Sequence, residues 1–553
     1  MKYLKWFNRA VRPYRGSIAA MMVCHVLLAA CSIGFVYVSK MLVDVAVALL
    51  GGHSVVRGLA FWAAAMVIIV ILRILLNALR SFLQTKTEIR LKNRLRSRLF
   101  HILLHVRNDG GARRHTGDVI NRLQEDVRMV SSAFAVSLPN LLGTILQFLA
   151  AFVFLIVLDA RLALVIVIVV PAGLLIGKFI TGRIRNLTLD IRNSDSKVQS
   201  HLQESLQHLT LLQSLEYTDT SSTELSGLQN TLYDNEIRRT KFSIVARMFI
   251  GFAFQAGHAI AFLWGVYGIS TGSVTYGMMT AFLQLVGQIQ RPLVDMSSQI
   301  PSIIYATASI DRLIELENLP MEDSGESVIM DGMAGICLEN VSFAYPDSDR
   351  DVLHDFTFDF KPGSRTAIVG PTGVGKSTLI RLLLSLLRPR SGTISLYTGA
   401  SGKESCVAVS PSTRGNLVYV PQGNTLFSGT IRENLLMGNP SATEEQLRDA
   451  LSTAAADFVF DLPAGIDTQC FEAGAGLSEG QAQRIAIARA LLRPGTILLL
   501  DEFSSALDAE TETLLLERLT TRLPSHTMIF ITHRDKIIDY CDNVLRMGGL
   551  RKY

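Results

Sequence analysis

Three uncharged stretches, each long enough to cross a lipid bilayer, dominate the first half of this chain. Ser17 to Ser39, Ala133 to Leu158 and Met248 to Ser270 contain no Asp, Glu, Lys or Arg. Each exceeds the roughly 20 residues that a helix needs to span the hydrocarbon core. The mean hydropathy of +0.32 is too high for an ordinary soluble protein of 553 residues. We therefore predict an integral membrane protein.

Three further apolar stretches complete the pattern. Gly58 to Leu79 holds only one charged residue, Arg73, and Leu162 to Gly177 and Thr275 to Gln290 are uncharged. The later part of the chain has no uncharged run of comparable length, and we expect it to be soluble. The predicted transmembrane helices lie near residues 17–39, 58–79, 133–158, 161–181, 246–270 and 275–300.

Lys and Arg are distributed unevenly around these spans. The amino-terminal flank and the segment from Arg80 to Arg128 are rich in them, whereas the connections after the first, third and fifth spans hold few. By the positive-inside rule the amino terminus is cytoplasmic, and six crossings place the carboxyl-terminal part in the cytoplasm too. We expect a bacterial inner (plasma) membrane. Because the basic run Lys86 to Arg98 leads out of a span, no nucleic-acid partner is expected.

The chain divides by composition into two parts and a linker. The long loops between spans two and three, and between spans four and five, place apolar residues three and four apart, so the membrane helices should continue into the cytoplasm. Glu317 to Gly332 is acidic and rich in turn formers. We predict a transmembrane domain at 1–310, a linker at 311–333 and a separate domain at 334–553.

The first functional motif in the soluble part of the chain is a candidate phosphate-binding loop. The strand-like run TAIVG leads into GPTGVGKST and then into the helical run LIRLLLSLL. This context makes the pattern G-x-x-x-x-G-K-[ST] credible as a P-loop, in which Lys376 reaches the β- and γ-phosphates and Ser377 ligates Mg²⁺. The predicted contacts are Gly370, Pro371, Thr372, Gly373, Val374, Gly375, Lys376, Ser377 and Thr378.

A second run, TILLLDE, ends in two acids. Four apolar residues before Asp501 predict a buried strand that delivers this carboxylate to the nucleotide, where it would hold Mg²⁺ through water. Glu502, the next residue, is placed to polarise an attacking water.

The order of motifs resembles the ATP-binding cassette (ABC) transporters, specifically exporter-type half-transporters, over the whole chain. VSFAYPD, VPQGNTLFSGTIREN, LSEGQ, SSALD and ITHR follow one another as in that family. The resemblance implies a type I exporter-like bundle of six helices, followed by an α/β P-loop domain of ABC type. It also implies ATP and Mg²⁺ as cofactors.

The resemblance also implies roles for residues that spacing alone does not assign. Tyr345 would stack on adenine, Gln422 would meet Mg²⁺ and the membrane domain, and His533 would stabilise the transition state. The signature and D-loop residues would act on the ATP of a second chain; they are Ser478, Gly480, Gln481 and Asp508. Glu472 falls where exporters keep a coupling-loop glutamate.

A complete site in this family needs two cassettes, so we expect a second half-transporter chain, in a homodimer or a heterodimer. Closure around two ATP molecules would reach the membrane domain through short helices near 113–123 and 204–217. The expected function is ATP-driven export or flipping of a lipid-like, amphipathic or drug-like substrate. An ATP-gated channel or channel regulator is the alternative, and the presence of both Glu502 and His533 favours a pump.

Polar residues within the spans leave two interpretations open: substrate contact, or hydrogen bonds between helices. They are Asn140, Gln147, Gln255, His258, Gln284, Gln288, Arg291 and Asp295.

The stretch GLSEGQAQR raises a narrower question. Ser478 and Gln481 fit a capping box, yet a helix N-terminus is also an anion site. Glu479 replaces the usual glycine of the signature, and Ala482 stands where Arg or Lys is common. We expect Glu479 to weaken ATP-driven closure if it faces the phosphate, and to be neutral if it faces solvent.

Overall fold

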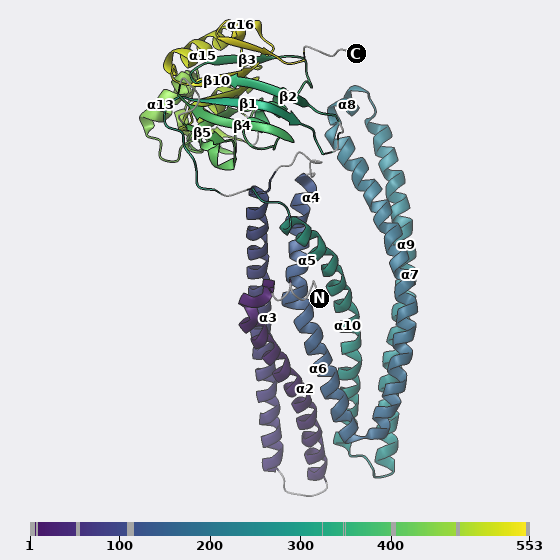
Figure 1. The fold of residues 1–553 in the computed structure, drawn as a ribbon. Helices are drawn as coiled ribbons and strands as arrows, with labels where there is room; N and C mark the ends of the chain where they lie inside the picture. Colours follow the sequence, from purple (N-terminus) through teal and green to yellow (C-terminus); the bar gives the residue numbers. More distant parts are fainter. Residues whose placement is uncertain are drawn as a thin grey trace. The chain divides into compact units, whose positions relative to one another are not determined.

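The computed structural model describes residues 6, 9–50, 56–107, 116–322, 325–346, 348, 350–399, 405–471 and 476–548. Within the helices, the description leaves out the side chains of residues 50, 56, 116, 166–182, 185, 246, 250, 297 and 298. The chain divides into two compact units, each considered by itself (Figure 1). The first unit is Met1–Phe100 with Val119–Leu316, and the second is His101–Asp118 with Glu317–Tyr553.

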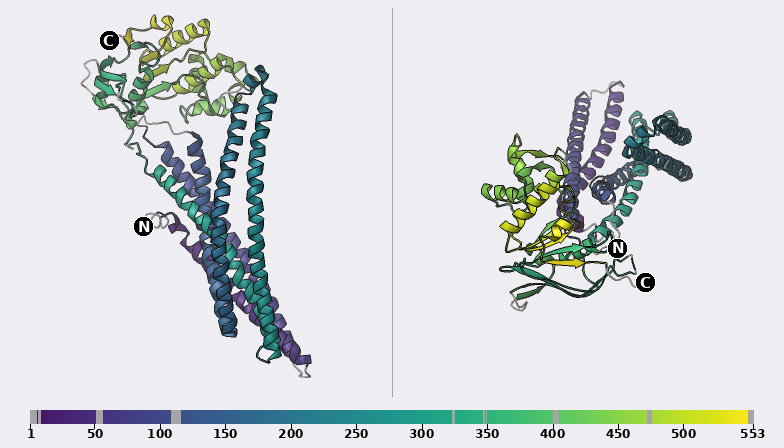
Figure 2. Two further views of the ribbon diagram at one scale, coloured as in Figure 1. Left: turned by 90° about the vertical axis from the view of Figure 1, so that its right-hand side faces the viewer. Right: turned by 90° about the horizontal axis from the view of Figure 1, so that it is seen from above.

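The first unit is built from very long helices. They are α2 (Arg15–Leu50), α3 (Val56–Leu104), α6 (Leu138–Leu158), α7 (Ala160–Gln207), α9 (Thr218–Ser270) and α10 (Tyr276–Glu317). Shorter pieces are η1 (Arg12–Tyr14), α4 (Thr116–Asn121), η2 (Arg122–Asp126), α5 (Val127–Ser132), η3 (Ala133–Ser137) and α8 (Leu209–Ser214). Figures 1 and 2 show α7 and α9 side by side, with α8 joining one pair of ends. The helices therefore run far beyond the predicted membrane spans.

Four helical stretches are long and apolar enough to cross a membrane: Arg9–Leu49, Arg57–Leu104, Gly117–Leu158 and Thr218–Ser270. They contain the predicted spans at 17–39, 58–79, 133–158 and 246–270. The predicted span at 161–181 lies in α7, but most of its side chains fall outside the described residues. The span at 275–300 lies in α10, which is not among the four. Six spans therefore remain a prediction.

The surface of these helices suits lipid. Large apolar side chains stay exposed, among them Ile68, Ile74 and Phe252. Others, including Leu155 and Phe282, form a buried cluster where α2, α6, α9 and α10 meet. Because hydrocarbon replaces water around a membrane helix, apolar groups on both faces are expected there.

The second unit contains two main sheets (Figure 1). An antiparallel sheet has the order β2-β1-β4-β5, and a parallel sheet has the order β11-β3-β10-β9-β6. The strands are β1 (Ala334–Phe343), β2 (Leu353–Phe360), β3 (Arg365–Val369), β4 (Ser391–Thr398), β5 (Ser405–Ala408), β6 (Leu417–Val420), β7 (Gly429–Thr430), β8 (Gln469–Cys470), β9 (Ile497–Asp501), β10 (Thr527–Ile531) and β11 (Asn543–Arg546). The helices are α11 (Lys376–Leu383), η4 (Pro411–Asn416), α12 (Ile431–Leu436), α13 (Glu444–Thr453), η5 (Asp457–Asp461), η6 (Gly465–Asp467), α14 (Glu479–Leu491), α15 (Ala509–Arg522) and α16 (Asp535–Ile538).

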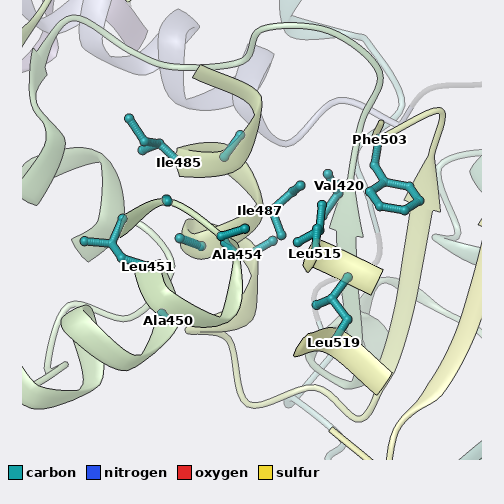
Figure 3. Packing of buried hydrophobic residues seen from close by; sticks show 14 of the residues in the cluster. Val420, Ala450, Leu451, Ala454, Ile485, Ile487, Phe503, Leu515 and Leu519 are labelled. Atoms are coloured by element: carbon teal, nitrogen blue, oxygen red, sulfur yellow. The ribbon is translucent and has the colours of Figure 1, made fainter. Parts of the chain in front are cut away.

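The parallel sheet is buried on both faces. Leu498 and Leu500 of β9 lie in a core with α12 to α15, whereas Ile497 and Leu499 lie in a second core with the antiparallel sheet and α11. This alternation follows from the two-residue period of a strand. Figure 3 shows the first core, where Leu451, Ile487 and Leu515 converge from three helices. Packing on both faces fixes the strand ends on which the site depends. The predicted fold class, a helical bundle followed by an α/β domain, is confirmed.

Candidate functional site

The carboxyl ends of four parallel strands gather the predicted site residues. β3, β10, β9 and β6 lie side by side in that order. The P-loop follows β3, His533 follows β10, Asp501 ends β9, and Gln422 follows β6. Ligands of open α/β sheets bind at this edge, because neighbouring parallel strands all end there. The sheet thus brings together side chains that are far apart in the sequence.

The P-loop depends on its glycines. A Cβ added to Gly370 would lie 2.3 Å from the carbonyl oxygen of Met547, so only glycine fits against the end of β11. Gly373 has φ +83°, a left-handed backbone that glycine adopts without strain, and nothing lies within 4 Å of its missing side chain. The loop is therefore shaped on one side by β11 and open on the other, where a phosphate can approach the start of α11.

Lys376 lies at the centre of the cluster. Its side chain is buried, and Nζ donates to the carbonyl oxygens of Gly370 at 2.6 Å and Pro371 at 3.3 Å. Nζ is also 3.0 Å from Nε2 of His533. Burial lowers the pKa of Lys376, while Glu502 and Asp501 act in the opposite direction. The ammonium group is therefore satisfied inside the loop, where a phosphate would exchange for these partners.

Glu502 is fixed by both its main chain and its side chain. Its φ is +45°, uncommon for a residue with a Cβ, and its N–H donates to the carbonyl of Ile531 at 3.0 Å. Gln422 Nε2 donates to Oε2 at 2.6 Å, and Gln483 Nε2 donates to the main-chain carbonyl at 3.3 Å. Strained backbone of this kind is concentrated at functional sites.

One ring nitrogen of His533 lies between a base and an acid. Nε2 is 3.0 Å from Lys376 Nζ and 3.2 Å from Glu502 Oε1. Without a proton Nε2 accepts from Lys376, and with one it donates to Glu502, so it cannot serve both neighbours at once. The protonation of this nitrogen therefore decides which of the two groups His533 restrains.

The residues predicted to hold Mg²⁺ supply oxygen donors. Asp501 is buried, and burial, followed by the adjacent Glu502, raises the pKa of its carboxyl group. Ser377 and Gln422 are exposed on the same side of the sheet. A hydroxyl, a carboxylate and an amide carbonyl are ligands that Mg²⁺ accepts, together with water and phosphate oxygens. The donor set therefore fits this ion, which would relieve the buried charge of Asp501.

Two residues near Asp501 were not predicted from the sequence. The hydroxyl group of Tyr419 hydrogen-bonds Asp501, and burial, with the charge of Asp501, raises the pKa of Tyr419 to about 12. Gln483 supports Glu502, as described above. Neither residue belongs to a sequence motif with a stated chemical role, because each reaches its partner only through the tertiary fold. Tyr419 has only its position on β6, just before Gln422, to suggest a role.

Tyr345 lies against the start of α11. Its hydroxyl is 3.1 Å from Thr378 Oγ1 and accepts from Arg381 Nη1 at 3.4 Å, and its ring meets Phe343 edge-on at 5.1 Å between centroids. A cavity of about 970 Å³ adjoins the P-loop. It is lined by Thr372 and Gly373 of the loop and by basic side chains, including Arg350 and Arg546. A nucleotide fits a pocket of this size.

The signature residues form a separate structure. Ser478 Oγ accepts from the Gln481 N–H at 3.2 Å, and Gln481 Oε1 accepts from the Ser478 N–H at 2.9 Å. The expected capping box is therefore present at the start of α14. Glu479 is exposed in the first turn. A Cβ at Gly480 would lie 2.7 Å from the carbonyl oxygen of Ala506, so glycine permits this close approach.

One chain does not join the two halves of the site. In the described part of the chain, no hydrogen bond connects Ser478, Gly480 or Gln481 to the P-loop. Asp508 instead caps α15 by accepting from the N–H groups of Glu510 at 3.1 Å and Thr511 at 2.9 Å. Glu472 lies outside the described residues. Ser478, Glu479 and Asp508 are exposed, whereas Gly480 and Gln481 are half-buried.

The predicted coupling segments coincide with short helices. α4 lies within 113–123, of which 113–115 fall outside the described residues, and α8 lies within 204–217.

Among the polar residues of the spans, Asn140 accepts from Gln84 at 2.6 Å, and Gln288 donates to the carbonyl of Ser32 at 3.4 Å. His258 pairs with the carbonyl of Phe254 at 3.1 Å within its own helix. These contacts fit hydrogen bonds within the helical bundle.

Comparison with known proteins agrees with this geometry. Residues 18–293 match the family described as the ABC transporter transmembrane region, and residues 353–505 match the family described as ABC transporter. The ATP-binding/permease protein YgaD of Bacillus subtilis (strain 168) is 30% identical over 438 residues, which cover 77% of this chain and 75% of that protein.

Other similar proteins carry more specific names. A fatty acid ABC transporter ATP-binding/permease protein of Mycobacterium bovis is 28% identical over 78% of this chain and 68% of its own length. The ABC multidrug transporter mdr2 of Aspergillus fumigatus is 33% identical over 78% of this chain and 55% of its own length. The structure of a bacterial Atm1-family ABC exporter with ATP bound has a TM-score of 0.78 at 25% identity, covering 97% of this chain and 94% of that one.

Proposed function

This chain belongs to the ABC transporters, and from that premise we propose that it is a half-transporter that exports or flips an amphipathic, lipid-like or drug-like molecule at the expense of ATP. The observation that carries the proposal is the cluster of Lys376, Gln422, Glu502 and His533 at the edge of the parallel sheet. An ATPase needs a P-loop to hold the phosphates, a buried acid close to it and a base next to that acid. These groups lie together at this edge of the sheet. The helical domain fused to it supplies the path through the membrane.

Each residue of the cluster has a distinct role. Lys376 leaves its loop carbonyls to bind the β- and γ-phosphates. Asp501, Ser377 and Gln422 hold Mg²⁺, which draws charge from the phosphate oxygens when bound. Glu502 accepts the proton of the attacking water, and His533 Nε2, already next to both Lys376 and Glu502, donates to the charge that develops on the γ-phosphate. Tyr345 stacks on adenine after releasing Thr378.

A second chain completes the site. The exposed turn at Ser478 and the exposed Asp508 meet the ATP on the partner's P-loop, and the partner's turn does the same in return. Because this chain carries both Glu502 and His533, we propose a homodimer with two working sites. The amino terminus and the nucleotide-binding unit lie on the cytoplasmic side of a bacterial inner membrane. The uneven distribution of Lys and Arg supports this orientation.

The substrate class is supported by the lipid-facing helices and by the names of two relatives, one for fatty acids and one for multiple drugs. The test is transport into liposomes that carry the protein with its nucleotide-binding units outward. ATP should drive a fluorescent amphiphile against its gradient, and Glu502→Gln should not. Flux that only runs down the gradient, equal in the two proteins, would contradict a pump and favour a gated channel.

A further inference from the structure

Four polar side chains meet between three membrane helices. We call them the His25 cluster: His25 on α2, Arg80 and Gln84 on α3, and Asn140 on α6. Gln84 Nε2 donates to Asn140 Oδ1 at 2.6 Å, and the Asn140 side chain also reaches the ring of His25. His25 is 6% exposed and Gln84 9%. His25 and Gln84 are therefore buried, and Arg80 and Asn140 half-buried, in the region where α2 packs against α6 (Figure 1).

The fold makes room for the imidazole of His25. A Cβ added to Gly143 would lie 2.0 Å from His25 Nδ1, so α6 presents bare backbone to the ring. On the other side of the ring, Nε2 is buried and has no hydrogen-bond partner among the described residues. A buried polar atom without a partner destabilises the fold unless a ligand or water satisfies it. One ring nitrogen of His25, Nε2, can therefore still form a hydrogen bond.

Arg80 brings a charge that its surroundings do not balance. Its guanidinium group interacts electrostatically with His25 and with Cys24. Its Nε is buried and has no hydrogen-bond partner in the described part of the chain. The helices around it contain no Asp or Glu at 15–43, 56–87 or 127–158. Cations within a membrane domain are costly unless an anion pairs with them. None of these three segments can supply the carboxylate that Arg80 lacks.

The cluster lies toward the cytoplasmic ends of the first two predicted spans, because Arg80 directly follows Leu79, the last residue of the second span. Cys24 and Leu76 share a buried contact group, with Leu83 packed against it, so the cluster is level with Cys24. Cys24 follows the start of the first predicted span, Ser17, by seven residues, or about 10 Å along a helix. An arginine at the rim can extend into water, whereas here its Nε is enclosed.

We propose that the His25 cluster binds the anionic headgroup, a carboxylate or a phosphate, of an amphiphile that the chain transports. The proposal rests on the exporter function proposed above and names its substrate class. Arg80 supplies the opposite charge, His25 Nε2 supplies a hydrogen bond, and the Gln84–Asn140 pair fixes the position of both. Carboxylates and phosphates share the need for such charge-assisted partners.

The test measures binding to the full-length chain in nanodiscs of neutral phosphatidylcholine. The probes share one oleoyl tail and differ in the headgroup: oleate, oleoyl lysophosphatidate, neutral monoolein and cationic oleylamine. At least one anionic probe should bind about tenfold or more tightly than monoolein, as expected for a charged hydrogen bond. The comparison of oleate with lysophosphatidate decides between a carboxylate and a phosphate.

Variants connect that preference to the cluster. Arg80→Gln should bind anionic and neutral probes alike, and Arg80→Lys should retain part of the preference. Arg94→Gln is the matched control, because Arg94 is an exposed arginine on the same helix outside the cluster. It should behave as wild type. If Arg80→Gln does not fold, Arg80→Lys and His25→Gln carry the test, each with a preference reduced severalfold.

The outcomes separate the site from the exporter function. Equal binding of all probes by wild type, or an unchanged preference in Arg80→Gln, overturns the site. Either result leaves the exporter function intact if ATP still drives monoolein or a neutral dye into liposomes. An anionic preference that depends on Arg80, in a protein that moves no amphiphile with ATP, supports the site and overturns the exporter function.

Discussion

The nucleotide-binding unit contains two regions proposed to bind phosphate, and they are built in opposite ways. At the sheet edge, Lys376, Glu502 and His533 come from three different strand ends and contact one another. At the signature turn, the side chains of Ser478 and Gln481 each accept from the other's main-chain N–H, three residues apart in the sequence. The first region is positioned by tertiary packing, and the second by a local capping box.

This difference indicates that the two regions have different roles. The sheet-edge cluster is arranged within one chain, so it can carry out chemistry that needs fixed distances. The signature turn is exposed and complete in itself, so it can be presented to a second chain without a change in its own fold. Substitutions in the first region should change the chemical step or nucleotide affinity, whereas substitutions in the second should change the response to the partner.

The largest effect is expected for Glu502→Gln. The variant keeps the shape and the hydrogen-bonding capacity of the side chain but loses the base, so ATP hydrolysis should fall about 100-fold or more. ATP binding should remain close to wild type. Measurement of phosphate release together with equilibrium binding of a fluorescent ATP analogue checks both. Hydrolysis at the wild-type rate would remove Glu502 from the mechanism.

Lys376→Ala should act on binding rather than on chemistry alone. The loss of a charged donor to the β- and γ-phosphates should weaken ATP affinity about 10- to 100-fold. Because the buried ammonium group bonds to two loop carbonyls and lies 3.0 Å from His533 Nε2 in the free protein, the melting temperature without nucleotide should also fall modestly. Titration of the analogue gives the affinity. Unchanged affinity would contradict the assignment of the P-loop.

Ser478→Ala separates capping from catalysis at the signature turn. The loss of the cap should cost about 1 kcal/mol of stability. Thr443 is a matched control, because it forms the same box with Gln446 at the start of α13. Thr443→Ala should lose similar stability and keep its ATPase activity, whereas Ser478→Ala should also lose activity, about tenfold. Equal activity in the two variants would leave Ser478 with a capping role only.

The smallest effect is expected for Glu479→Gly. If the acid faces the partner's phosphate, its removal should raise ATPase activity by at most about fivefold, since like charges about 4 Å apart in water repel by about 1 kcal/mol. Glu479→Gln removes the charge and keeps the length, so it should reproduce most of the gain. Rates equal to wild type in both variants would show that Glu479 faces water.

Much of the fold could be predicted because its signals are local. Uncharged apolar runs located four stretches that are long and apolar enough to cross a membrane, and the strand–glycine loop–helix order located the P-loop. The capping box at Ser478 could also be predicted, since its partners are three residues apart. Helix length was harder to predict. α3 and α9 continue far into polar sequence, where periodicity predicts a helix but gives no end point.

The contacts between distant segments could not be predicted. Tyr419 meets Asp501, and Gln483 meets the carbonyl of Glu502, only because β6, β9 and α14 pack together. No spacing in the sequence encodes such pairs. The His25 cluster did leave a signal, because Arg80 follows a span and no acid is close in sequence. Its partners on α2 and α6 became visible only once the helices were packed.

The close approach of Gly480 to the carbonyl of Ala506 has a consequence for the timing of the two sites in a dimer. In the proposed dimer, Gly480 would belong to the turn that meets the partner's nucleotide, and Ala506 follows shortly after Glu502, the proposed base for the chain's own nucleotide. With Gln483 bound to the carbonyl of Glu502, the two segments touch at both points. A displacement imposed on one must therefore shift the other. The two hydrolysis events then become synchronised by steric contact, and Gly480→Ala should desynchronise them without removing any group that takes part in the reaction.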